Sequence, residues 1–232
     1  MTTTSEKRYH VTQGQPTGIE YTPSADFVVA DGPRDIGLCF VGDGFVAGYG
    51  DPKALGWVSR VVGRTPLEED ATLSSYNLGV RGASSADVMT RWRAECPPRW
   101  AGRGERRLVV GVGAEDVAQG ITTARSRLNL ANVLDEASST GVGTFVVGPT
   151  PTLDAEVNAR LRVLADAQAD VCARRGVPYV DCFAPLEGHD QWQSDLAAGD
   201  TVHPGQAGYG LIAWLVLNGG WAAWLGLGEH AG

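Results

Sequence analysis

Asp43 is the first residue whose type and place suggest chemistry. It stands between Gly42 and Gly44, directly after the apolar run of residues 38–41. A run of this kind predicts a buried strand, and the glycines allow the chain to turn tightly where the strand ends. Ligands of open α/β sheets bind at the carboxyl ends of strands. The sequence therefore predicts that residues 42–44 lie at a sheet edge where a ligand binds.

Strands and helices alternate along most of the chain. Segments of strand length predict strands at residues 36–41, 72–78, 107–112, 144–147 and 178–180. Apolar residues at helical spacing predict helices around residues 55–62, 84–96, 128–140 and 153–175, with a last helix after residue 205. A loop is expected over residues 181–200. This alternation predicts an α/β fold, a parallel sheet covered by helices on both faces with functional loops after the strands.

The composition limits the classes of partner. A chain of 232 residues that is 43% hydrophobic and 20% charged suits one α/β domain and is short for two. Its formal net charge of -8 disfavours nucleic acid and anionic membranes as partners. The densest basic group is Arg103, Arg106 and Arg107, which we interpret as part of a solvated loop. A small-molecule substrate is the remaining expectation.

Cysteine placement and the termini favour a cytoplasmic protein. The four cysteines fall singly within apolar or helical segments, as reduced buried thiols do. Residues 1–9 lack the apolar core of a signal peptide. Residues 1–34 have no sustained periodicity and are predicted to form an irregular leader, followed by one domain over residues 35–232. The apolar segment 211–227 is interrupted at residues 218–220 and is short for a membrane span, so we predict a packed helix and a Trp-rich tail.

Four short motifs in this order resemble the SGNH hydrolases, also called the GDSL esterase and lipase family. The motifs are Gly42-Asp43-Gly44, Asn77-Leu78-Gly79, Gly113-Ala114-Glu115-Asp116 and Asp200-Thr201-Val202-His203. They follow successive predicted strands, and the resemblance extends from residue 36 to about residue 217. It implies a three-layer α/β/α domain of flavodoxin-like type with a five-stranded parallel sheet, and a hydrolase-like activity.

The resemblance also implies roles for individual residues. In that family the residue after Gly-Asp is a serine nucleophile, and the final His is its general base, so His203 would be the base and Asp200 its orienting partner. A hydroxyl attacks near neutral pH only when a base removes its proton, and an imidazole does this only when its tautomer is fixed. The backbone N–H groups of Gly44 and Gly79 would donate to an oxyanion, with Asn77 beside them in the pocket.

Two positions depart from the family pattern. Gly44 stands where the serine is expected, so no hydroxyl is available there to attack a substrate. Glu115 stands where the family has the asparagine that completes the oxyanion site. An ionised carboxylate at that place would oppose the negative charge that builds up during acyl transfer. Ordinary serine esterase chemistry is therefore not expected.

Three explanations remain open from the sequence. A conventional esterase whose nucleophile is replaced by Gly44 leaves Glu115 unexplained. A non-catalytic small-molecule binding protein gives no reason to keep Asp200 and His203. We favour a repurposed enzyme in which Glu115 and His203 act as acid and base, with space opened at Gly44 for a substrate atom or a water. Such a site suits elimination, cyclisation, isomerisation or water-mediated hydrolysis of a small acyl-containing metabolite, such as one of secondary metabolism.

Other polar groups have simpler structural explanations. Asp43 is expected mainly to accept backbone N–H groups, Asp116 to fix a loop or cap a helix, and Ser84 and Ser85 to be helix N-caps. Trp192, in the loop before the Asp-His motif, is the tryptophan that we most expect to contact a substrate. No motif for a metal or a dinucleotide is present in the sequence, so we expect no cofactor.

Overall fold

The structure, a computed structural model, describes residues 33–227, so almost all of the predicted leader lies outside the described residues. The strands are β1 (Arg34–Gly42), β2 (Ala71–Gly79), β3 (Glu105–Gly111), β4 (Gly143–Val147) and β5 (Tyr179–Val180). They form one sheet in the order β2-β1-β3-β4-β5, and all four pairings are parallel. The predicted five-stranded parallel sheet is confirmed, with the strand order of flavodoxin-like folds.

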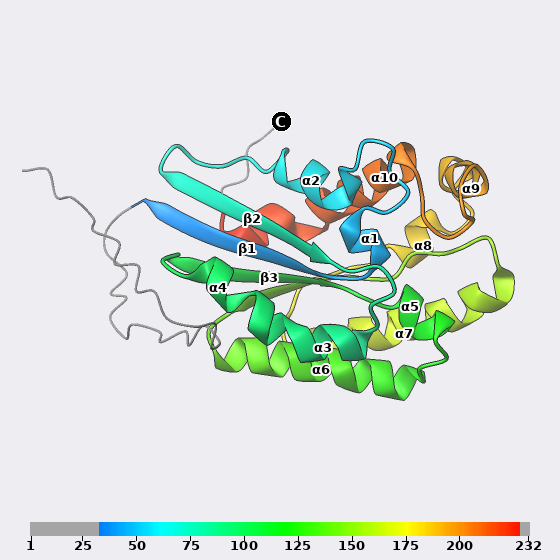
Figure 1. Cartoon of the computed structure of the whole chain (residues 1–232), viewed down its shortest axis with the longest axis horizontal. Helices are drawn as coiled ribbons and strands as arrows, with labels where there is room; N and C mark the ends of the chain where they lie inside the picture. The colour runs from blue at the N-terminus through cyan, green and yellow to red at the C-terminus, as the bar shows by residue number, and fades with distance from the viewer. Residues whose placement is uncertain (1–32, 228–232) are drawn as a thin grey trace, which may run out of the picture.

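Helices cover both faces of the sheet (Figure 1). One layer holds α3 (Ser85–Glu95), α6 (Thr123–Ser139) and α7 (Ala155–Ala173), and the other holds α2 (Gly56–Val62) and α10 (Gln206–Val216). The remaining α-helices are α1 (Gly44–Ala47), α4 (Pro97–Trp100), α5 (Ala114–Ala118), α8 (Phe183–Leu186), α9 (Asp190–Ala197) and α11 (Ala222–Leu225). The predicted α/β/α layering is thus confirmed.

Strand β1 contributes side chains to the hydrophobic cores on both faces of the sheet. Its side chains alternate between the two faces of the sheet, as the pleat requires. Leu38 and Phe40 pack into the core under α2 and α10, whereas Cys39 and Val41 pack into the core under α3 and α6. Because both faces are covered, the strand is apolar at nearly every position, and this explains the continuous apolar run in the sequence.

The predicted loop over residues 181–200 is wrong, because it contains α8 and α9. Asp181 Oδ1 accepts hydrogen bonds from the backbone N–H groups of Phe183 and Ala184, which starts α8. The ring nitrogen Nδ1 of His189 accepts from the N–H of Trp192 at the start of α9. Helices of four and eight residues are too short to show a helical period, so only their caps mark them.

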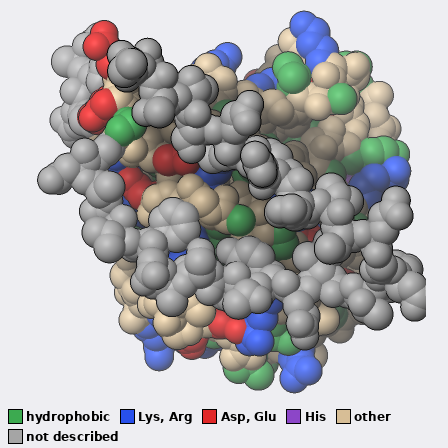
Figure 2. Space-filling model, turned by 60° about the vertical axis from the view of Figure 1, so that its left-hand side comes forward, with side chains coloured by type: hydrophobic (Ala, Val, Ile, Leu, Met, Phe, Trp, Pro, Cys, Tyr) green, Lys and Arg blue, Asp and Glu red, His purple; other side chains and the backbone are tan. Residues whose placement is uncertain are grey.

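The basic group at residues 103–107 is also not a solvated loop. Arg103 pairs with Asp35, and Arg107 pairs with Glu105, while Arg106 donates to the carbonyl oxygen of Thr140. These residues lie at the amino-terminal edge of the sheet. Figure 2 brings this edge forward and shows basic and acidic side chains interspersed over it. The local positive charge is therefore balanced by carboxylates rather than gathered into one patch.

The carboxyl-terminal segment ends the domain with a broken helix. After α10, a π-helical turn, η1 (Leu217–Trp221), contains Gly220 in the left-handed region at φ 92°. Trp221 is buried in the core beside Phe40 and Phe145, which confirms the predicted packing of this segment. In the part of the chain that the structure describes, no helix has both the length and the apolarity needed to cross a bilayer.

Candidate active site

The carboxyl ends of β1, β2 and β3 and the short helices α1 and α5 form one edge of the molecule (Figure 1). Helix α1 begins at once after β1 because Asp43 caps it, with Oδ1 accepting from Phe45 N at 2.9 Å. It ends after one turn at Gly48, which has a φ of 77°. This confirms Asp43 as an acceptor of backbone N–H groups. The tight turn brings Gly44 to the loop that carries His203.

Asp200 and His203 form the pair that the resemblance implies. Asp200 Oδ2 lies 2.8 Å from His203 Nδ1, and Oδ1 accepts from the backbone N–H groups of Val202 and His203. Burial acts to raise the pKa of Asp200, but these hydrogen bonds outweigh it, and the pKa is lowered overall. An ionised Asp200 can only accept, so Nδ1 of His203 carries the proton. Nε2 of the neutral ring is then left with a free lone pair and can act as a base.

The predicted open space at Gly44 is wrong, because the imidazole fills it. An ideal Cβ on Gly44 would lie only 2.7 Å from His203 Nε2. The ring packs against Phe45, with ring centres 4.8 Å apart, and stands nearly perpendicular to Tyr49 at 4.9 Å. A side chain at position 44 would therefore require the imidazole to shift. Tyr49 was not identified from the sequence, where the Gly-Tyr-Gly pattern was its sole local signal.

Asn77 and Gly79 connect β2 to α1. Asn77 Nδ2 donates to the carbonyl oxygen of Val46 at 2.7 Å, and Asn77 Oδ1 accepts from Gly79 N at 3.0 Å. A Cβ on Gly79 would lie 2.2 Å from the backbone nitrogen of Ala47, so only glycine allows this approach. Because the Gly79 N–H is already donated to Asn77, the prediction that it is a free oxyanion donor is wrong. Both residues position α1 instead.

The carboxyl of Asp43 is affected by its burial and by the charge of Glu115. Burial, with a contribution from the charge of Glu115, raises the pKa of Asp43 to about 7. Glu115 is half-buried in the first turn of α5, and its carboxylate has no hydrogen-bond or ion-pair partner within residues 33–227. The charge of Glu115 therefore acts on Asp43. That Glu115 and His203 face each other across a substrate stays a prediction.

The raised pKa of Asp43 predicts a pH-dependent stability. In the unfolded chain an Asp carboxyl has a pKa of about 3.9, so folding favours the protonated form of Asp43. Its stabilising contribution is fully present below pH ~4 and is lost as the pH rises to about 7. Asp43→Asn resembles the protonated form, so the wild type should lose up to ~4 kcal/mol relative to this variant over that range. Urea unfolding at pH 4.5 and pH 8 measures the free energy of unfolding of both proteins. The same pH dependence in the wild type and in Asp43→Asn would contradict this prediction.

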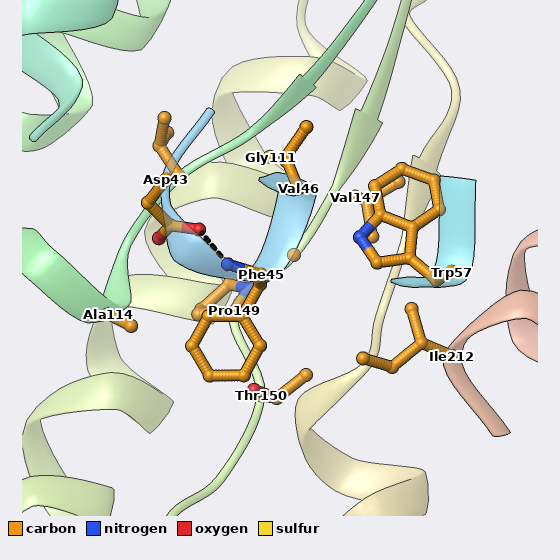
Figure 3. A pocket seen from close by; sticks show the side chains of 12 residues that line it. Asp43, Phe45, Val46, Trp57, Gly111, Ala114, Val147, Pro149, Thr150 and Ile212 are labelled. Carbon is orange, nitrogen blue, oxygen red and sulfur yellow. Dashed lines mark hydrogen bonds between the residues drawn. The ribbon is translucent and has the colours of Figure 1, made fainter. Parts of the chain in front are cut away.

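A small cavity lies behind Phe45 (Figure 3). Asp43 and Ala114 line one side, and Trp57 and Ile212 line the other. Its empty volume is about 330 Å³, part of which is open to solvent. Thr150 also lines this cavity, and its buried hydroxyl has no protein partner within residues 33–227.

The structure also places Trp192 and Asp116, for which the sequence predicted a substrate contact and a structural role. Trp192 is buried, and its Nε1 donates to the carbonyl oxygen of Pro151, so the predicted substrate contact is wrong. Asp116 of α5 is buried and accepts from Ser85 N in the first turn of α3 and from the Ser126 hydroxyl of α6, so it has a structural role, joining helices rather than fixing a loop. Within residues 33–227, no three His, Cys, Asp or Glu side chains are grouped so that they could hold a metal ion.

The start of α3 separates the two serines. Ser84 is its N-cap and forms a capping box with Asp87, as predicted. Ser85 is not a cap: its backbone N–H binds Asp116, and its hydroxyl accepts from Asn129. Neither serine replaces the missing nucleophile at position 44, because each hydroxyl already has a structural partner.

Comparisons with known proteins agree with this architecture. The acetylxylan esterase Axe2 from Geobacillus stearothermophilus superposes with a TM-score of 0.68 at 18% identity, over 86% of this chain and 99% of the esterase. A member of the lipolytic protein G-D-S-L family from Veillonella parvula DSM 2008 gives a TM-score of 0.64 at 22% identity, over 79% of this chain and 97% of that one. At these identities the likeness shows the fold alone.

The sequence comparisons complete the assignment. No curated protein matches the chain. The model of the GDSL-like lipase/acylhydrolase family matches residues 40–211, which is well over half of the chain and includes all four motifs. The chain therefore belongs to the GDSL-like lipase/acylhydrolase family.

Proposed function

We propose that this protein is an enzyme of the GDSL-like fold that works by acid–base catalysis without a covalent intermediate. The observation that carries the proposal is the state of His203. Its Nδ1 is held by an ionised Asp200, and its Nε2 lies over the backbone of Gly44 rather than beside a hydroxyl. A base so oriented, with no nucleophile beside it, removes a proton from a water or from the substrate itself.

The acid in this proposal is the carboxyl pair of Glu115 and Asp43. Burial raises the pKa of Asp43 to about 7, so this carboxyl retains a proton near neutral pH more readily than an exposed one does. Burial favours placing this proton on Asp43, and Glu115 is the more exposed member of the pair. In this scheme Glu115 contacts the substrate and Asp43 exchanges the proton with it. The reaction is water-mediated hydrolysis, elimination, cyclisation or isomerisation of a small acyl-containing molecule.

A second candidate function is small-molecule binding without turnover. The close packing of His203 against Gly44, Phe45 and Tyr49 favours it, since a closely packed ring can serve to fill space. The hydrogen bond with Asp200 is harder to explain in a binding protein, because packing alone does not require a fixed tautomer. Loss of His203 distinguishes the two functions, as the Discussion describes.

Restoring a serine at position 44 tests the proposal against a conventional esterase. The new side chain must displace the imidazole, and Glu115 still opposes an oxyanion, so Gly44→Ser should not react with a fluorophosphonate probe. Its turnover of p-nitrophenyl acetate should not exceed that of the wild type. Gly210→Ala is the matched control, because a Cβ there meets no atom within 4 Å. Rapid labelling of Gly44→Ser with a gain in turnover would overturn the acid–base proposal.

A further inference from the structure

His203, Tyr49 and Arg81 form a stack at the rim of the active site. The centres of the His203 and Tyr49 rings are 4.9 Å apart, and the guanidinium carbon of Arg81 lies 3.3 Å from the centre of the Tyr49 ring. The guanidinium can therefore be no farther from the imidazole than the sum of these two distances, about 8 Å. A small substrate that reaches His203 also reaches Arg81.

The backbone on both sides of this stack is fixed. The buried hydroxyl of Tyr209 donates to the carbonyl oxygen of Tyr49 at 2.6 Å. Val80, which precedes Arg81, donates its N–H to the carbonyl oxygen of Gly42 at the end of β1. The stack is thus connected to α10 on one side and to the central strand on the other. Its geometry is set by the fold rather than by an unsupported loop.

The guanidinium of Arg81 is available to a ligand. It forms no ion pair and no hydrogen bond with any of residues 33–227 and is held by the Tyr49 ring. A guanidinium stacked on an aromatic face keeps its N–H donors free in its own plane. These donors match a carboxylate, which they bind through two parallel hydrogen bonds.

The groove beside the stack carries a net positive charge. It contains about 800 Å³ of open space and is lined by residues 47–52, Ala54 and Arg81. Asp51 and Arg81 are the charged residues of this lining. The Asp51 side chain is fully buried and pairs with Arg60, so its charge does not face the groove. A Cβ on Gly50, another lining residue, would lie 3.3 Å from the Cβ of His203, so the groove borders the residue that supplies the base.

We propose that Arg81 binds a carboxylate of the substrate, with the acyl chain lying in this groove. The inference rests on the proposed function and narrows its substrate class to short acyl groups that end in an acid. Because Arg81 and the imidazole are at most about 8 Å apart, and each bond advances an extended chain by about 1.25 Å, the reacting carbonyl and the carboxylate are separated by no more than about six bonds. Succinyl, glutaryl and adipyl groups meet this requirement.

A matched pair of esters tests the inference. Mono-p-nitrophenyl glutarate and p-nitrophenyl valerate have acyl chains of equal length and differ in the terminal carboxylate. The wild type should prefer the glutarate in kcat/KM. Arg81→Gln should lower kcat/KM for the glutarate by about 10–100-fold, as for loss of a charge-assisted hydrogen bond, and change that for the valerate less than about twofold. Arg81→Lys should restore part of the preference, and Arg125→Gln on α6 is the control. An equal effect of Arg81→Gln on both esters would overturn the inference.

A binding measurement separates this inference from the proposed function. Monomethyl glutarate is titrated into His203→Ala by calorimetry, with and without Arg81→Gln. Binding that depends on Arg81 would support the carboxylate site even if the wild type hydrolysed neither ester, in which case the proposed function alone would fail. Binding that is absent, or that is the same with and without Arg81, would overturn the carboxylate site whatever the activity.

Discussion

Trp57→Ala is expected to lower the free energy of unfolding by about 3–5 kcal/mol, the range for removing a buried tryptophan or phenylalanine side chain. Trp57 on α2 is 1% exposed and packs edge-on against Phe40 of β1, with ring centres 5.6 Å apart. Its ring also approaches Gly111 at the end of β3. Removing it leaves a void beside the small cavity behind Phe45, where the close contacts of β1 and β3 limit collapse.

Trp214→Ala is the matched control for this prediction. Trp214 is the same residue type on α10, but it is 60% exposed, so its removal should change the free energy of unfolding by less than about 1 kcal/mol. Urea unfolding followed by far-UV circular dichroism measures both variants. Equal losses in the two variants would contradict the packing described here, because the surroundings of the two side chains differ so strongly.

The strands and the long helices of this fold were predictable because each carries a sustained pattern. β1 is buried on both faces and therefore reads as a continuous apolar run, and α7 shows an apolar stripe over five turns. The short helices α5, α8 and α9 carry no such pattern. Each buries only one or two side chains besides Asp116, and α9 alone of the three has a side-chain N-cap, His189.

The parts of the candidate site that could be predicted are those formed by residues close together in the sequence. Asp200 and His203 are three residues apart, and one turn of backbone brings them together, so their hydrogen bond could be anticipated from the motif. The close approach of His203 to Gly44 could not be anticipated, because it depends on how a loop 159 positions later in the chain packs over α1. The stack of Arg81 on Tyr49 joins different loops in the same way and leaves no trace in local sequence.

His203→Ala has the largest expected effect on activity. A positioned general base contributes about 10²–10⁴-fold to a reaction rate, so kcat/KM for p-nitrophenyl acetate should fall by that factor. The base is held by Asp200, which stays ionised through its hydrogen bonds and fixes the proton on Nδ1. His189→Ala is the matched control. His189 is exposed and caps α9, so its loss should leave kcat/KM unchanged.

The most direct test of the central claim is therefore the ratio of kcat/KM between the wild type and His203→Ala, measured with p-nitrophenyl acetate at pH 8 on proteins shown to be folded by circular dichroism. Acid–base catalysis by His203 predicts a ratio of at least about 100. A ratio within about threefold of one would contradict it and would leave the imidazole as a packing element of a binding protein.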